Sequence, residues 1–254
     1  MPLYKATDRM SRLVGDNLDL LQMLYHFRIP LGFGDRTVAE VCEAHSIDTV
    51  TFLAIASITL HGQHTASTPL HIPTLLRYAQ CSHDFFLNYA VPANRQKLEA
   101  ALMAEDKLRT LILSVYDQYA EEVKTHMNYE DDDVFIYVNR LVEGQVLEDD
   151  YTIQNYAQQH DEASDRLSEL KNLLIRFYPG SDNNMRLLEA LHAIYQSARW
   201  LELHCRIEDI LLLPAILRLE RQLRTSQATP QPHGQKAGLC HTMRTTHPKL
   251  TPRS

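Results

Sequence analysis

The sequence predicts an all-α protein: an antiparallel four-helix bundle, preceded by a small helical domain and followed by a disordered tail. Three observations support this prediction. The 254 residues include only eight glycines and few runs of β-branched residues. Four long segments place apolar residues at steps of three and four, which is typical of helices that bury one face. Short connections between these segments favour antiparallel neighbours.

Composition and charge restrict the partners and the compartment. The chain is 44% hydrophobic, enough to bury a full core, and its net charge of −7 argues against nucleic acid as a partner. No apolar run has the length of a signal peptide or a membrane span. The four cysteines show neither a disulfide-framework spacing nor a CxxC pair, which suits a reducing cytosol. We therefore expect a soluble, cytoplasmic protein without a membrane partner.

Residues 1–60 are predicted to form the small helical domain. A first amphipathic helix is expected over 10–24, where apolar residues recur with helical spacing. Thr37 is a predicted helix N-cap, and Glu40 three residues later completes a capping box. A third short helix is expected to begin near Asp48. Because the segment lacks a basic face, we expect it to pack or to bind protein.

The remainder of the chain divides into three parts. Residues 61–69 are polar and turn-rich and are predicted to be a linker. Residues 70–224 are predicted to form the four-helix bundle. Residues 225–254 contain four prolines, four basic residues and no acidic residue, and are predicted to be disordered.

Four helices are expected within the bundle. The first begins near Pro73 and is kinked or ended by Pro92. The others are predicted over about 95–141, with a break near 105, over about 149–177, and over about 184–224. The apolar face of the third is expected to consist of Ile153, Tyr156, His160, Ala163, Leu167, Leu170, Leu174 and Phe177.

Each bundle helix carries one histidine on its apolar face, and two helices add a glutamate four residues later. A lone histidine on such a face is more often a satisfied core residue, and one His–Glu pair stabilises a helix by only a few tenths of a kcal/mol. A buried carboxylate, however, costs several kcal/mol unless it is paired or binds a metal. Because all four helices follow the pattern, we predict a metal site with the candidate ligands His83, His126, Glu130, His160, His204 and Glu208.

The ligand types restrict the metal. Imidazoles and carboxylates without thiolate favour iron, manganese or zinc over copper(I). Six protein ligands exceed the needs of one tetrahedral zinc and suit two six-coordinate ions, each held by two imidazoles and bridged by both carboxylates. Such ions keep positions for a solvent-derived bridge and for a small ligand. Cys81 and Cys205 lie near His83 and His204 in sequence but off the apolar step, so we expect both to be packing thiols.

These motifs resemble those of the hemerythrin-like four-helix di-iron proteins. The resemblance is carried by Ser82-His83-Asp84, His126-Met-Asn-Tyr-Glu130, Gln159-His160-Asp161 and His204-Cys-Arg-Ile-Glu208. Over about 8–222 the chain is similar to one branch of that family, the regulators of cell morphogenesis and nitric-oxide signalling, also called iron–sulfur cluster repair proteins. Residues 35–42 of the chain resemble the signature of the N-terminal domain of that branch. The resemblance implies two iron ions, oxo- and carboxylate-bridged, with manganese or zinc as the less favoured metals.

The chain departs from that branch in two places. The family's adjacent cysteines, expected before a glycine, are replaced at Leu31-Gly32, which argues against thiol chemistry in the N-terminal domain. Six residues after Glu208 stands Pro214, whereas the equivalent position after Glu130 is Ile136, and we expect this change to affect helix geometry more than metal binding.

The resemblance implies a protein of the nitric-oxide and oxidative stress response that binds NO or O2 and supports repair of iron–sulfur centres. The alternative is a sensor of O2, NO or redox state that acts through a protein partner, which the missing cysteines favour. A simple iron store is a third function. A partner, or a second copy of the chain, is expected to bind the N-terminal domain. Whether the protein turns over NO is left open by the sequence.

Overall fold

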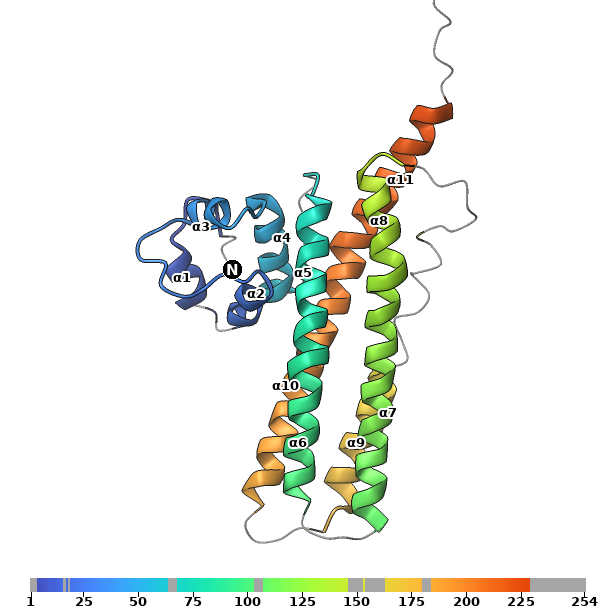
Figure 1. Ribbon diagram of the computed structural model, residues 1–254. Helices are drawn as coiled ribbons and strands as arrows, with labels where there is room; N and C mark the ends of the chain where they lie inside the picture. Colours follow the sequence, from blue (N-terminus) through green and yellow to red (C-terminus); the bar gives the residue numbers. More distant parts are fainter. Residues whose placement is uncertain are drawn as a thin grey trace, which may run out of the picture.

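The computed structural model describes residues 4–15, 17, 19–63, 68–102, 107–145, 153, 163–179 and 184–228. Within these residues every named secondary-structure element is a helix. Four long helical segments lie side by side as an antiparallel bundle (Figure 1). A group of short helices packs against one end of this bundle. The predicted all-α bundle with a preceding helical domain is confirmed.

The four bundle segments are built from α-helices, three of them interrupted by a π-helical turn. In chain order they consist of α5 (Ile72–Phe85), η1 (Phe86–Ala90) and α6 (Val91–Ala101); α7 (Lys107–Tyr129), η2 (Glu130–Val134) and α8 (Phe135–Val142); α9 (Ala163–Phe177); and α10 (Met185–Ile207), η4 (Glu208–Leu212) and α11 (Leu213–Ala228).

Pro92 does not end the first bundle helix, so the predicted start of the second helix near residue 95 is wrong. Residues 91–101 form α6 and continue the first segment, and α7 begins at Lys107. The turn η1 lies directly before Pro92 and changes the helical hydrogen bonding there. This shift offers room for a proline ring and for its missing N–H group, both of which an unbroken α-helix would oppose.

The three π-helical turns occupy equivalent places. They begin at Phe86, Glu130 and Glu208, each six residues before Pro92, Ile136 and Pro214 respectively. The turn η2 forms although Ile136 stands at the position of the proline, so proline is not required for a π-helical turn here. The replacement of proline by Ile136 was expected to change the helix geometry, but it does not remove this turn. π-Helical turns are frequent at functional sites, and two of these begin at a predicted metal ligand.

The N-terminal domain contains α1 (Met10–Gly15), α2 (Leu20–His26), α3 (Val38–Ala44) and α4 (Thr49–His61). The predicted single helix over 10–24 is wrong, because α1 and α2 are separate. The side chain of Asn17 lies between them and donates to the carbonyl of Leu13 and to the hydroxyl of Tyr4. The predicted capping box of Thr37 and Glu40 is confirmed, and the Asp48 side chain caps α4.

The N-terminal helices share a hydrophobic core with one half of the bundle. Buried residues of α1–α4 pack in one cluster with those of α5, α8, η4 and α11. Arg77 of α5 donates to the carbonyls of Phe27 and His45, and Arg199 of α10 lies 2.7 Å from Asp19. The N-terminal helices are therefore docked on the helices that carry the predicted metal ligands.

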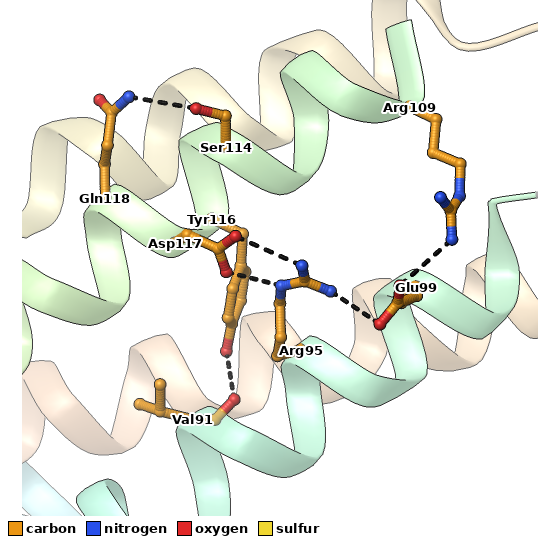
Figure 2. Close-up of polar contacts among 8 residues, drawn as sticks. All are labelled: Val91, Arg95, Glu99, Arg109, Ser114, Tyr116, Asp117 and Gln118. Atoms are coloured by element: carbon orange, nitrogen blue, oxygen red, sulfur yellow. Dashed lines mark hydrogen bonds and ion pairs between the residues drawn. The ribbon is translucent and has the colours of Figure 1, made fainter. Parts of the chain in front are cut away.

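A second cluster fills the other half of the bundle, between α6, α7, α9 and α10. Figure 2 shows the polar contacts that join α6 to α7 in this half. Arg95 contacts Asp117 at 2.6 Å and Glu99 at 3.1 Å, and Arg109 contacts Glu99 at 3.2 Å. The buried Tyr116 hydroxyl donates to the Val91 carbonyl at 2.8 Å. These contacts fix the relative position of the two helices.

The predicted apolar face of the third bundle helix, the predicted linker and the predicted tail can each be compared with the described residues. On the predicted apolar face of α9, Leu167, Leu170 and Leu174 are buried, but Phe177 at the end of the helix is 64% exposed, which corrects that position. The connection between His61 and Ile72 coincides with the predicted linker, of which 64–67 lie outside the described residues. The predicted start of the tail at 225 is wrong, because residues 225–228 continue α11. Residues 229–254 of the predicted tail lie outside the described residues.

The length and hydropathy of the described helices decide whether one of them could span a membrane. None of them is, by itself, both long and apolar enough to cross a membrane. The pair α3 and α4, bent by 118°, meets the requirement only when the two are taken together, by length and composition.

Candidate metal centre

Five of the six predicted ligands come together between the bundle helices. His83 comes from α5, His126 and Glu130 from the junction of α7 and η2, and His204 and Glu208 from the junction of α10 and η4. The sixth, His160, lies outside the described residues. Because each ligand lies on the apolar stripe of its own helix, packing of the stripes is enough to bring the five together.

Four of these side chains form what we call the closed group: His83, Glu130, His204 and Glu208. One ligand atom from each lies within 4.8 Å of the others, and all four residues are at most 2% exposed. His83 Nε2 lies 3.0 Å from Glu130 Oε2, and His204 Nε2 lies 3.3 Å from Glu208 Oε1. The two imidazole Nε2 atoms are 3.2 Å apart. Nitrogen and oxygen donors therefore converge on one buried point.

A second set of ligand atoms, the open group, consists of His126, Cys205 and Glu208. Its atoms also lie within 4.8 Å of one another, but His126 and Cys205 are only half-buried. His126 Nε2 is 3.3 Å from Glu130 Oε1. Glu208 belongs to both groups, and Glu130 contacts histidines of both. The two carboxylates thus lie between two neighbouring ligand groups.

Cys205 is expected from the sequence to be a packing thiol, which stays a prediction, and its sulfur lies within 4.8 Å of ligand atoms of His126 and Glu208. Its sulfur faces the open group because Cys205 precedes Glu208 by three residues, which puts the two side chains on the same side of the helix. That spacing is the sequence signal that could have identified it.

Asp131 is a further functional residue that the sequence analysis missed. Its Oδ1 lies 3.0 Å from Nδ1 of His83, the ring nitrogen opposite the one that faces the closed group. A carboxylate on the outer nitrogen of a metal-binding histidine fixes the orientation of the ring and its tautomer. Phe135 stacks on the same ring at a centroid distance of 5.4 Å. His83 is therefore held in place from two sides.

The two histidines of the closed group differ in protonation. Burial lowers the pKa of His83, but hydrogen bonds to Asp131 and Glu130 outweigh it and raise this pKa to about 9. Burial lowers the pKa of His204 to about 4, opposed by Glu130 and assisted by the positive charge of His83. A protonated His83 can therefore donate to the neutral His204 across their 3.2 Å contact. Binding of a cation at these nitrogens requires the loss of that proton.

The N-terminal domain reaches the closed group through His26, the last residue of α2. His26 is buried, and its ring packs edge-on against Tyr78 and Phe85 of α5. Burial, and then the charge of His204, lower the pKa of His26 to about 3. This histidine is therefore neutral at pH 7 and is part of the packed wall beside the closed group.

Tyr119 lies beside the open group, two turns before His126 on α7. Burial, and then Cys205, raise the pKa of its phenol. Its hydroxyl is buried and has no hydrogen-bond partner in the part of the chain that the structure describes. Burial, together with Glu208 and Glu130, also raises the pKa of Cys205. The thiol therefore lies between a phenol and two carboxylates.

The donor set fits a bound metal cation. Two carboxylates buried to within 1% of full burial lie among imidazoles, an arrangement that is costly without a compensating positive charge. Imidazole and carboxylate donors suit iron, manganese and zinc. The buried cluster of histidines and glutamates can therefore bind a metal.

The family model of the hemerythrin HHE cation-binding domain matches residues 90–216, which is half of the chain. The matched segment contains Glu130, Glu208 and the histidines at 126, 160 and 204, whereas His83 precedes it. No curated protein and no solved structure matches the chain.

Proposed function

Because the chain belongs to the hemerythrin HHE cation-binding family, we propose that it is a non-haem di-iron protein of the nitric-oxide and oxidative stress response, which supports the repair of iron–sulfur centres. The observation that carries this proposal is the pair of ligand groups that share Glu208. Two groups with a common carboxylate are the protein side of a two-metal site, whereas a single group would suit one ion.

The residues have separate roles in this proposal. His83 and His204 hold one ion, His126 holds the other, and Glu130 and Glu208 lie between them. His160 completes the second position, as the family resemblance implies. Asp131 orients His83, because its Oδ1 lies 3.0 Å from the outer ring nitrogen of that histidine. When bound, the two ions supply a redox-active centre that can take up NO or O2.

The proposal places the protein in the cytoplasm. The described cysteines Cys42, Cys81 and Cys205 are free thiols, which suits a reducing compartment. It also includes a protein partner or a second copy of the chain on the N-terminal domain. Leu31, which stands where the iron–sulfur cluster repair branch that the chain resembles has cysteines, is 68% exposed and could contribute an apolar contact to such a partner.

A sensor of NO, O2 or redox state is the second candidate, and one observation favours it. The N-terminal helices share their core with the ligand-bearing helices, and His26 packs beside the closed group. A shift of the ligand-bearing helices on binding of a gas would therefore displace residues of the N-terminal domain, to which we propose that the partner binds. The two functions differ in whether the gas is consumed.

Metal analysis of the full-length chain tests the di-iron proposal. Protein purified in air should contain about two iron ions per chain and show the absorption of a bridged ferric pair. Protein reconstituted with ferrous iron that retains none after desalting would contradict the proposal. Zinc or manganese in the native protein, at the same stoichiometry, would change the metal and keep the site.

Two further measurements separate the candidate functions. Repeated consumption of NO under anaerobic, reducing conditions indicates turnover, and recovery of a damaged iron–sulfur enzyme indicates repair. Uptake of about one NO per centre without consumption, together with altered hydrogen exchange in α2 and α4, indicates a sensor. A Glu208→Ala variant serves as the control in each case, because it belongs to both ligand groups.

A further inference from the structure

The open group includes a thiol that the family resemblance does not supply. Cys205 Sγ, a ring nitrogen of His126 and a carboxylate oxygen of Glu208 lie within 4.8 Å of one another. They come from two different bundle segments, α7 and the junction of α10 with η4. Sulfur, nitrogen and oxygen donors therefore converge at this point. A thiol that only packed against its neighbours would not need two polar donor atoms so close to it.

The surroundings of Cys205 also differ from those of an ordinary buried cysteine. Most buried thiols pack among apolar groups, as Cys42 does in the shared core. Cys205 instead lies within 4.8 Å of a carboxylate oxygen of Glu208 and a ring nitrogen of His126. Such a polar environment gives a thiol little apolar contact, but it suits a thiolate that binds a cation.

We propose that Cys205 is a thiolate ligand of the ion held by the open group. This inference rests on the proposed two-metal site. The thiol gives up its proton when the ion binds, and the sulfur then coordinates together with His126 and Glu208. The two positions of the centre therefore differ: the closed group offers only nitrogen and oxygen, whereas the open group adds sulfur.

This difference predicts a difference in metal preference. Thiolate ligands favour softer ions such as zinc and cobalt(II) over manganese, while imidazole and carboxylate ligands discriminate less strongly. We therefore expect the open group to bind cobalt or zinc more tightly than manganese. The open group is also the less buried of the two, so its ion is the one that solvent and added ligands reach first.

The test is a cobalt(II) titration of the full-length, metal-free protein. Cobalt bound to a thiolate gives a charge-transfer band in the near ultraviolet that nitrogen and oxygen ligands alone do not give. The band should grow with one of the two cobalt equivalents, and bound cobalt should protect Cys205 from alkylation, as measured by mass spectrometry. In Cys205→Ser the band should be lost, and the cobalt ion of the open group should bind about tenfold more weakly or worse.

The matched control is Cys81→Ser. Cys81 is also half-buried and lies two residues before His83, but it belongs to neither ligand group. This variant should keep the band and both affinities. Circular dichroism, and retention of the cobalt ion of the closed group, show whether Cys205→Ser is folded.

The outcomes separate this inference from the proposed function. Two bound ions without a sulfur band in the wild type, with Cys205 alkylated equally fast in the presence and absence of cobalt, overturn the role of Cys205 and leave the two-metal site intact. Failure of the wild type to bind any cobalt, iron or zinc overturns both. The wild-type measurements decide the matter even if the serine variant does not fold.

Discussion

The two His–Glu pairs of the chain look alike in sequence but lie in different surroundings in the structure. His204 belongs to the closed group and is 2% exposed, whereas His126 belongs to the open group and its side chain is 17% exposed. The N-terminal domain accounts for part of the difference, because His26 packs on the side of His83 and His204. An identical local motif thus gives two positions whose chemistry is set by what covers them.

Substitution of the residue common to both groups should have the largest effect. We expect Glu208→Gln to reduce iron content from about two ions per chain to nearly none, because both groups lose a carboxylate ligand. The metal-free variant should unfold no more easily than the metal-free wild type, since it no longer buries a charge. The control is Glu202→Gln, an exposed glutamate of α10. Full iron content in Glu208→Gln would show that the groups do not share this ligand.

Substitution of one histidine from each group should separate the two positions. We expect His126→Ala to retain about one ion per chain, because the four ligands of the closed group remain. We expect His204→Ala to lose the closed-group ion and to retain the other, because His204 does not belong to the open group. Metal analysis after desalting measures both. Equal loss of both ions in the two variants would mean that the groups act as one cooperative site.

Proton release on metal binding should reveal the raised pKa of His83. In the metal-free protein this pKa rises from 6.5 to about 9, so His83 stabilises the fold fully below pH 6.5, and this contribution is lost as the pH rises through 9. Metal affinity should show the opposite trend and increase with pH up to about 9, because the ion displaces this proton.

Asp131→Asn sharpens that prediction. Removal of the carboxylate lowers the pKa of His83, so the variant should release fewer protons than the wild type when it binds metal at pH 8. Calorimetry in buffers of different ionisation enthalpy measures the number released. Asp132→Asn, at a neighbouring exposed position, is the control. Equal proton release in Asp131→Asn and the wild type would show that Asp131 does not set the charge of His83.

The smallest expected effect concerns the covering of the closed group by the N-terminal domain. The pKa of His26 is lowered to about 3, so the unfolded chain binds a proton below pH 6.5 that the folded chain excludes. Stability is therefore lost as the pH falls, by roughly 2 kcal/mol between pH 7 and pH 5. His26→Phe keeps the aromatic packing and should unfold less readily in acid than the wild type.

Thermal unfolding of the metal-free protein at pH 7 and pH 5 measures this difference. His192→Phe, at an exposed position of α10, is the control and should behave as the wild type does. An unchanged acid sensitivity in His26→Phe would indicate that the neighbouring His204, rather than the docked domain, controls the response of this region to pH.

The sequence alone determined the bundle and the convergence of five predicted ligands. Both follow from local rules: apolar residues at helical spacing define the face that each helix buries, and a ligand on that face must point into the core. The capping box at Thr37 and Glu40 is local in the same sense, because its partners are three residues apart. Periodicity therefore predicted these features correctly without knowledge of the tertiary structure.

The tertiary structure decided how the ligands divide, which further residues join them and where the helices turn. Cys205 meets His126, Asp131 meets His83, and His26 approaches the closed group only because segments far apart in the chain pack together. Pro92 lies within a helix because the turn η1 precedes it, an arrangement that no local propensity predicts. The physical reason is that burial, charge and proton affinity depend on neighbours in space, whereas periodicity reports only neighbours along the chain.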